Sequence, residues 1–475
     1  MGARRPDRGG GEARRPGGAA GRPNLPVDAP RFVAFQVIRA VSDNDAYANL
    51  ALPGLLRERQ LTGLDAAFAT ELTYGTLRSL GTLDRIIDRN VDREPDPAVR
   101  DALRMGAYQL LYTRVPPHAA VDTTVTLVRE TVNDGAAKFA NAIMRRVSEH
   151  TLEDWLTTVA PDAAENPAGN LAARTAHPEW IVRAFTDALG KDAAEITALL
   201  EADNVRPPVH LAARPGQITQ AELIAESGGS AGQWSPYAVT LAGGDPGALS
   251  SIHKGRSHVQ DEGSQLVATA VVNVPVQGQD DRWLDLCAGP GGKAGLLGAF
   301  GAERGADVLA VEVTEHRADL VAKATRGLPV YVKHADGRTV GHDPDLVEQG
   351  FDRVLVDAPC TGLGALRRRP EARWRRLPSD LPPLTKLQRE LLAAAVRAVR
   401  VGGVVGYVTC SPHITETRMT VMETLRKSKI PLELLDAREF LPAGMPGLGD
   451  GPTVQLWPHR HGTDAMFLAL LRRVG

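Results

Sequence analysis

The three cysteines of this chain, Cys287, Cys360 and Cys410, each follow a short apolar run that predicts a β-strand. Strands that alternate with helices form a parallel sheet, and open sheets of this kind bind ligands at the carboxyl ends of their strands. A buried structural cysteine is the ordinary interpretation of such a residue. Three of three at one predicted edge favour chemistry instead, at least for Cys360 and Cys410, because a thiolate is an effective nucleophile.

Acidic residues also follow strands of the same region. Glu312 ends VLAVE, 23 residues after Gly289, a spacing at which an acid accepts both hydroxyls of a ribose. Asp336 follows YVKHA, where it is placed to meet an adenine edge, and Asp357 follows DRVLV. One acid after one strand is usually a solvated cap, but acids after three successive strands predict a convergent site.

A glycine-rich turn lies between a predicted strand and a predicted helix in LDLCAGPGGK, residues 284–293. Backbone N–H groups at such a turn approach a ligand closely, and the helix N-terminus favours an anion. A Walker A loop requires Ser or Thr after the lysine, but Ala294 follows Lys293. A dinucleotide fingerprint fails at its second gap. The loop alone leaves an S-adenosylmethionine loop and a simple tight turn open.

The segment ALRRRPEARWRR, residues 365–376, holds six arginines and one tryptophan. Arginines there are expected to meet phosphates, and Trp374 or a guanidinium plane to stack on a base. A solvated basic surface is the alternative. A target base must be unstacked to reach such a site, so a flipped or single-stranded base is expected. The candidate RNA contacts are Arg367, Arg368, Arg369, Arg373 and Trp374.

Composition bounds the class of protein. The chain has 475 residues, 43% hydrophobic and 24% charged, with a formal net charge of −2, which excludes a strongly basic protein. No run approaches the ~18 apolar residues of a membrane span, and the N-terminus has no secretory apolar region. Three cysteines are too few for a disulfide scaffold. We expect a cytoplasmic protein with two or three domains and no metal site.

The chain divides into four predicted segments. Residues 1–29 form an Arg/Gly-rich tail that is expected to be disordered, since it has almost nothing to bury. Residues 30–165 show helical periodicity and predict an all-helical bundle, although 151–176 is Ala/Asp/Pro-rich and is interpreted as a linker. Residues 166–255 predict a small α+β module. Residues 256–475 alternate strands and helices and predict a doubly wound α/β domain.

Several motifs carry a family resemblance. DLCAGPGGK, DAPCTGLGALRRRPEARW, LQRELL and GYVTCS resemble the motifs of the Sun/Fmu family of RNA (cytosine-5) methyltransferases. HVQDEGSQL (258–266) resembles the segment before that family's first strand, and VPPHAAV (115–121) and KFANAIMRR (138–146) resemble the NusB-like RNA-binding domain fused to it in the RsmB subgroup. The resemblance implies a NusB-like helical domain and a Rossmann-like S-adenosylmethionine-dependent methyltransferase domain, joined by the small module.

The resemblance also implies roles for residues. Cys410 is the expected nucleophile, which forms an adduct at C6 of cytosine, Cys360 is the assisting cysteine, and Asp357 lies at the cytosine edge. S-adenosylmethionine is the expected cofactor, RNA (16S rRNA) the expected partner, and a monomer the expected state. The chain departs from the family at Gly289 (usually Ala) and Ala294 (usually Thr), and PHITET (412–417) leaves the role of Glu416 open. Expected cofactor contacts are Cys287, Ala288, Gly289, Pro290, Gly291, Gly292, Lys293, Glu312, Asp336 and Asp357.

Two other functions compete. A DNA cytosine-5 methyltransferase would use Cys360 as its nucleophile, but the second cysteine at 410 and the helical region argue against it. A non-catalytic RNA-binding or antitermination protein is possible on the helical domain alone, but the intact loop and both cysteines argue against that. An amino-methylating enzyme would need an Asp/Asn-Pro-Pro-aromatic turn, which Asp357-Ala-Pro-Cys360 is not.

Overall fold

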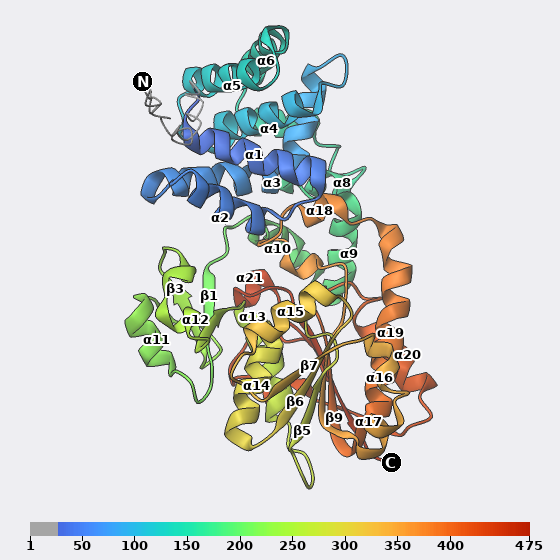
Figure 1. Cartoon of the computed structure of the whole chain (residues 1–475). Helices are drawn as coiled ribbons and strands as arrows, with labels where there is room; N and C mark the ends of the chain where they lie inside the picture. Colours follow the sequence, from blue (N-terminus) through green and yellow to red (C-terminus); the bar gives the residue numbers. More distant parts are fainter. Residues whose placement is uncertain (1–26) are drawn as a thin grey trace, which may run out of the picture.

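The computed structural model describes residues 27–475, so the predicted tail lies outside the described residues apart from its last three positions. The first helix, α1, begins at Ala29, because the Asp28 side chain accepts from the Arg31 N–H and Pro30 occupies the first turn. Figure 1 shows a helical domain at the end of the molecule that holds α1, a small module beside it, and an α/β domain that contains the C-terminus.

The N-terminal domain is helical, as predicted. Its core is formed by apolar side chains of α1, α3, α4 and α6, among them Phe35, Ile38, Leu83, Leu103 and Met144, all at most 5% exposed. These side chains recur at helical spacing, so each helix buries one face against its neighbours. The helices are α1 (Ala29–Asn44), α2 (Ala48–Glu58), α3 (Gly63–Asn90), α4 (Pro97–Tyr112), α5 (Pro117–Thr131) and α6 (Asp134–Val147).

The linker predicted at 151–176 was wrong, because most of that segment is helical. It forms α7 (Leu152–Val159) and α8 (Pro167–Thr175). Thr151 closes a capping box at the start of α7, and the buried Trp155 donates its indole N–H to the Val147 carbonyl at 3.0 Å. Alanine favours helix, and Pro167 stands in the first turn of α8, where proline is tolerated. The amino-acid composition of the segment gave no sign of the capping box or of the helix-starting proline, which depend on position.

A small α+β module follows, as predicted. Its sheet has the order β2-β3-β1-β4, with antiparallel neighbours. The elements are α9 (Glu179–Leu189), η1 (Gly190–Glu195), α10 (Ile196–Ala202), β1 (Val209–Ala213), α11 (Gln220–Ser227), β2 (Ser230–Ala231), β3 (Ala238–Leu241), η2 (Pro246–Ala248), α12 (Ser250–His253) and β4 (Ser257–Val259).

The C-terminal domain is built on a mixed sheet of order β10-β12-β9-β8-β5-β6-β7, with β11 also paired to β12. The strands from β9 to β7 are parallel, and β12 is antiparallel to β9. The chain order reverses at β5, so the carboxyl ends of β5 and β8 form the topological switch point, where open α/β sheets bind their ligands. The strands are β5 (Arg282–Asp285), β6 (Asp307–Glu312), β7 (Val330–His334), β8 (Phe351–Asp357), β9 (Val399–Thr409), β10 (Leu432–Leu435), β11 (Val454–Gln455) and β12 (Phe467–Arg473).

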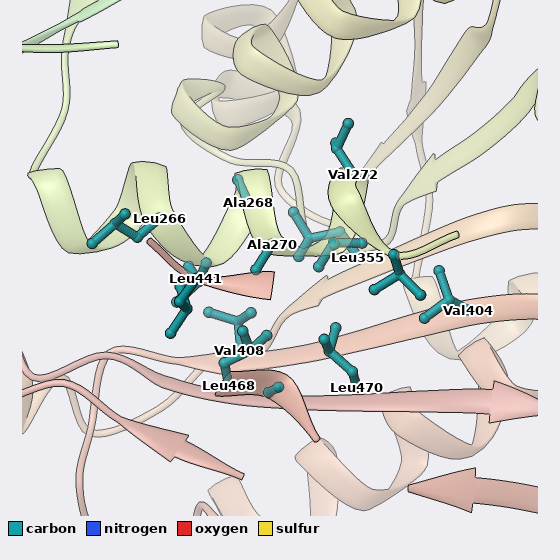
Figure 2. Close-up of a cluster of buried hydrophobic side chains, with 14 of the residues drawn as sticks. Leu266, Ala268, Ala270, Val272, Leu355, Val404, Val408, Leu441, Leu468 and Leu470 are labelled. Atoms are coloured by element: carbon teal, nitrogen blue, oxygen red, sulfur yellow. The ribbon is translucent and has the colours of Figure 1, made fainter. Parts of the chain in front are cut away.

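Helices cover both faces of this sheet. Figure 2 shows Leu266, Ala270 and their neighbours on one helix over Val408 and Leu470 of the strands. Val405 and Tyr407, which alternate with Val404 and Val408 along β9, pack with the helix on the other face. The helical elements are α13 (Glu262–Asn273), α14 (Gly292–Arg304), α15 (Glu315–Ala324), α16 (Gly337–Val340), α17 (Pro344–Gln349), η3 (Leu363–Ala365), α18 (Ala372–Arg375), η4 (Pro378–Asp380), α19 (Leu381–Ala398), α20 (Arg418–Lys427), η5 (Ala437–Phe440) and α21 (Pro458–His461).

Within residues 27–475, none of the helices combines the length and the apolar character that crossing a membrane requires.

Candidate active site

The sheet register brings Cys360 and Cys410 together. Asp357, the last residue of β8, pairs with Val408 of β9, so the turn after β8 and the end of β9 meet at one edge. The Cys360 and Cys410 Sγ atoms lie 3.4 Å apart, and both thiols are free and partly buried. The Gly364 N–H donates to the Cys410 carbonyl at 2.8 Å and holds the two segments in contact. The structure therefore offers two thiols to one reacting centre.

The two thiols have opposite acidities. The hydrogen bond from Cys360 lowers the pKa of Cys410, and the nearby Lys293 ammonium adds to that effect. The same hydrogen bond, with burial, raises the pKa of Cys360 well above its ordinary value. These directions favour the proton on Cys360 and, when the pair ionises, the thiolate on Cys410. A thiolate is the nucleophilic form of cysteine, so Cys410 is the better nucleophile.

Lys293 connects the glycine loop to these thiols. It lies in the first turn of α14, and its Nζ is 2.8 Å from Asp357 Oδ2. Burial alone would lower the pKa of Lys293, but the charge of Asp357 outweighs it and the pKa is raised. A persistent ammonium thus stands between the loop and the thiol pair, where it stabilises negative charge on Cys410 or on a bound substrate.

The glycine loop closes over the acid that ends β6. The Gly289 and Thr314 N–H groups each donate to the Glu312 carboxylate at 3.0 Å, and Glu312 is 3% exposed. A Cβ atom at position 289 would lie 2.2 Å from Glu312 Oε2. Gly291 has a φ of +108°, a backbone conformation that residues with a side chain rarely adopt. The loop and Glu312 therefore form one unit, and a Cβ at position 289 would require the Glu312 carboxylate to shift.

Asp336 lies at the same edge but farther out, after β7. Its carboxylate accepts from the Arg338 N–H at 2.9 Å and pairs with the Arg338 guanidinium at 2.6 Å, which lowers its pKa. Arg338 also bonds Glu390. In this structure the Asp336 carboxylate is thus engaged by Arg338 and is not free to bind a ligand.

Two residues at the end of β5 and just after it add to the sequence-based prediction. Cys287 is partly buried and packs against the apolar core, and burial raises the pKa of its thiol well above the ordinary value, which disfavours the reactive thiolate form. Asp285 was not among the predicted site residues. Its carboxyl oxygens are buried without a hydrogen-bond partner, and burial raises its pKa to about 7. Its place two residues before Cys287, at the end of β5, was the available signal.

Arg373 and Trp374 do not face outward as predicted. Arg373 is fully buried, and the Trp374 ring lies where a side chain at Gly81 of α3 would be. Figure 1 shows α18 (orange), which carries both, set against the helical domain. In this structure Arg373 offers no surface to RNA, and Trp374 is only partly exposed. Arg373 donates to the carbonyls of Arg78, Ala176 and Asp203 and to Asn204 Oδ1, over 2.7–3.2 Å.

The other three predicted RNA contacts are divided. Arg367 is buried and donates to the Gly462 carbonyl. Arg368 is partly exposed and is bonded to the buried Asp464 carboxylate. Arg369 is exposed, with its guanidinium 5.6 Å from the ring centroid of Tyr47. Among the five predicted contacts, Arg369 is exposed, Arg368 and Trp374 are partly exposed, and Arg367 and Arg373 are buried.

Comparisons with known proteins agree with the fold and identify the family. The family model of the 16S rRNA methyltransferase RsmB/F matches residues 274–472, and that of the NusB family matches residues 28–149. A putative methyltransferase of Mycobacterium tuberculosis is 55% identical over 452 residues, which cover 94% of this chain and 97% of that protein. The ribosomal RNA small subunit methyltransferase B of Escherichia coli is 32% identical over 409 residues, 84% of this chain and 90% of that protein.

Solved structures share the fold. The crystal structure of PH0851 has a TM-score of 0.77 at 22% identity and covers 94% of this chain and 98% of its own. NSun6 from Pyrococcus horikoshii with SFG has a TM-score of 0.51 at 20% identity, over 63% of this chain and 98% of its own. Both family models match, and the relatives are similar over most of their length and of this chain. The chain therefore belongs to the RsmB/F family of 16S rRNA methyltransferases and is an rRNA methyltransferase with a NusB-family helical domain.

Proposed function

We propose that this enzyme methylates C5 of a cytosine in 16S rRNA through a covalent adduct on Cys410, with S-adenosylmethionine as methyl donor. The observation that carries the proposal is the 3.4 Å contact between the Cys360 and Cys410 sulfurs, with the thiolate favoured on Cys410. Two free thiols in contact and of opposite acidity suit a reaction in which one attacks and the other transfers a proton.

The chemistry explains why two thiols are needed. C5 of cytosine is too weak a nucleophile to accept a methyl group directly. When the Cys410 thiolate bonds to C6, the electron pair of the C5–C6 double bond becomes available at C5 and forms the bond to the methyl group. Release then needs loss of the C5 proton and cleavage of the C6–S bond. Cys360, which holds a proton, can give it to the departing Cys410 sulfur and take the C5 proton in exchange.

The residues of the edge fit S-adenosylmethionine, which supplies an electrophilic methyl group when bound. The glycine loop exposes backbone N–H groups at the start of α14, suited to the carboxylate of the amino-acid part. Glu312 ends the next strand, where an acid accepts ribose hydroxyls. The related fold of NSun6 was solved with SFG, an analogue of S-adenosylmethionine. Asp336 would serve the adenine edge only after exchanging its bond to Arg338.

Lys293 and Asp357 would serve the cytosine. Their ion pair lies between the loop and the thiols, so a cytosine placed over Cys410 has an ammonium and a carboxylate at its polar edge. That pair can hydrogen-bond N3, N4 or O2 of the ring and stabilise the charge that develops after attack. A base must leave its stack to reach this site. The NusB-family domain would bind the flanking RNA.

The test compares two variants of the full chain, Cys410→Ala and Cys360→Ala, with S-adenosylmethionine and 16S rRNA from a strain that lacks the enzyme. Cys410→Ala should give neither methylation nor a covalent complex. Cys360→Ala should attack and transfer the methyl group but release slowly, so that a denaturant-resistant protein–RNA complex accumulates. Denaturing gels and mass spectrometry measure the complex, and bisulfite sequencing locates the modified cytosine.

The same experiment can overturn the proposal. If Cys410→Ala traps RNA and Cys360→Ala does not, the roles are reversed and the mechanism follows the DNA-type enzyme. If both variants methylate RNA at the wild-type rate, the covalent mechanism is excluded.

A further inference from the structure

The carboxyl group of Glu416 is buried between the two cysteine loops. Glu416 is 0% exposed. Its Oε1 accepts from the Thr361 N–H at 2.8 Å, and its Oε2 accepts from the Ser411 hydroxyl at 2.6 Å and from the Thr361 hydroxyl. Thr361 and Ser411 are the residues that directly follow Cys360 and Cys410. One carboxyl group thus bonds the neighbour of each thiol.

The two cysteines are held in the fold in different ways. Cys410 directly continues β9, which is central in the sheet and paired on both sides, with β8 and β12. Cys360 lies in a turn between the end of β8 and η3, outside any ladder. A residue on a paired strand end keeps its place without extra support, whereas a turn residue depends on the hydrogen bonds of the turn.

Besides the Gly364 N–H bond to the Cys410 carbonyl, several of the bonds that support the Cys360 turn lead to Glu416. Thr361 gives it both its N–H and its hydroxyl. The side-chain amide of Gln388 on α19 donates to the Pro359 carbonyl at 2.9 Å and to Glu416 Oε1 at 3.0 Å. Glu416 therefore fixes the residue after Cys360 directly, and the residue before it through Gln388. Outside this group, Arg376 donates to the Thr361 carbonyl at 3.1 Å.

We infer that Glu416 is a positioning residue that holds Cys360 against Cys410, and that it serves release of the RNA adduct more than its formation. The inference rests on the proposed covalent mechanism. In the release step the C5–H electron pair forms the C5–C6 double bond, the C6–S pair returns to Cys410, and Cys360 exchanges one proton for the other. That exchange requires sulfur–sulfur contact, whereas attack by Cys410 loses only the part of its lowered pKa that the hydrogen bond from Cys360 supplies.

The electrostatics agree with this role. The hydrogen bond with Cys410, burial and the charge of Glu416 all raise the pKa of Cys360. Glu416 thus helps to keep on Cys360 the proton that the departing sulfur takes.

The decisive variant is Glu416→Ala in the full chain. It should behave like Cys360→Ala: turnover on 16S rRNA falls about 100-fold, the size expected when a catalytic group is misplaced by about 1 Å, and the denaturant-resistant RNA complex accumulates. The KM for S-adenosylmethionine should stay within about twofold of the wild type, because the glycine loop is untouched. Gel quantification of the complex and steady-state methylation measure the two quantities.

Matched variants separate positioning from general damage. Glu416→Gln keeps an oxygen for Thr361 N–H and Gln388, and its amide can donate to the two hydroxyl oxygens, so turnover should return to within about tenfold of wild type and the complex should fade. Thr361→Val removes one donor and should shift both readouts in the same direction by less. Glu439→Ala, an exposed glutamate of the same domain, should change neither.

Three outcomes would overturn the inference. They are wild-type turnover in Glu416→Ala, loss of turnover without any trapped complex while S-adenosylmethionine still binds, and a Glu416→Gln variant as impaired as the alanine. Should Glu416→Ala fail to fold, Thr361→Val and Glu416→Gln decide by the same two readouts. Failure of the covalent mechanism itself is distinguishable, because then Cys360→Ala traps no RNA either.

Discussion

The glycine-loop edge and the arginine segment both follow strands of the same sheet, yet the side chains of the first meet at the candidate site and most of those of the second pack inside the protein. At the glycine-loop edge (residues 287–293, Glu312 and Asp357), polar groups predicted to meet do so, with the Lys293–Asp357 pair at 2.8 Å and Glu312 bonded to the loop. In the arginine segment (365–376), a surface predicted to face RNA is instead largely built into the protein, with Arg373 fully buried.

The difference lies in what covers each region. Positions at the carboxyl ends of parallel strands are set by the sheet itself, so the local sequence is enough to place them. The arginine segment meets another domain, and its guanidinium groups satisfy main-chain carbonyls at helix C-termini. Arg373 reaches the ends of α8 and α10, and Arg375 donates to the Val41 and Ala46 carbonyls at the end of α1. A guanidinium suits such a place as well as it suits a phosphate, since both offer acceptors with negative character.

The largest effect is expected at the glycine-loop edge. Lys293→Met removes the ammonium and leaves Asp357 facing the buried Asp285 with no cation between them. Methyl transfer in a single turnover should fall by about 10²–10³-fold, the usual loss when one electrostatic contact to a developing charge is deleted. Rapid quenching with labelled S-adenosylmethionine measures it.

Lys293→Arg is the matched control, because it keeps the charge and should recover part of the rate. Methyl transfer at the wild-type rate in Lys293→Met would show that the pair is structural and that the edge works through its backbone alone.

Sequence reasoning succeeded where one element sets the geometry and failed where two elements must be known together. The strand–helix alternation predicted the doubly wound sheet, and the three strand-end acids were correctly placed after β6, β7 and β8. The sequence could not show that the Arg338 guanidinium would pair with the Asp336 carboxylate, because that ion pair depends on the conformation of the turn that contains both residues. Glu416 stayed open for the same reason: its donors come from Thr361, Gln388 and Ser411, which lie on three separate elements.

A smaller effect, on stability, is expected in the arginine segment. Arg373→Ala should lower the free energy of unfolding by about 3–5 kcal/mol, because it removes the donor from three buried carbonyls and from the partly buried Asn204 Oδ1. Arg373→Lys should recover little, since one ammonium cannot replace the planar fork. Thermal unfolding monitored by calorimetry measures both. RNA affinity may be compared only at temperatures where the domains stay folded, and there the salt dependence of binding should be unchanged.

The smallest effect is expected for the exposed member of the segment and decides what remains of its predicted RNA role. Arg369→Ala should leave unfolding within about 0.5 kcal/mol of the wild type, since the side chain is a surface group that only stacks on Tyr47. If Arg369 contacts a phosphate, RNA affinity should fall modestly and the slope of log affinity against log salt should decrease by about 1. Arg426→Ala, an exposed arginine at the end of α20, is the control for loss of one positive charge. A salt slope that changes equally in both variants, or in neither, would mean that the arginine segment serves domain packing alone and that the RNA path runs over another face.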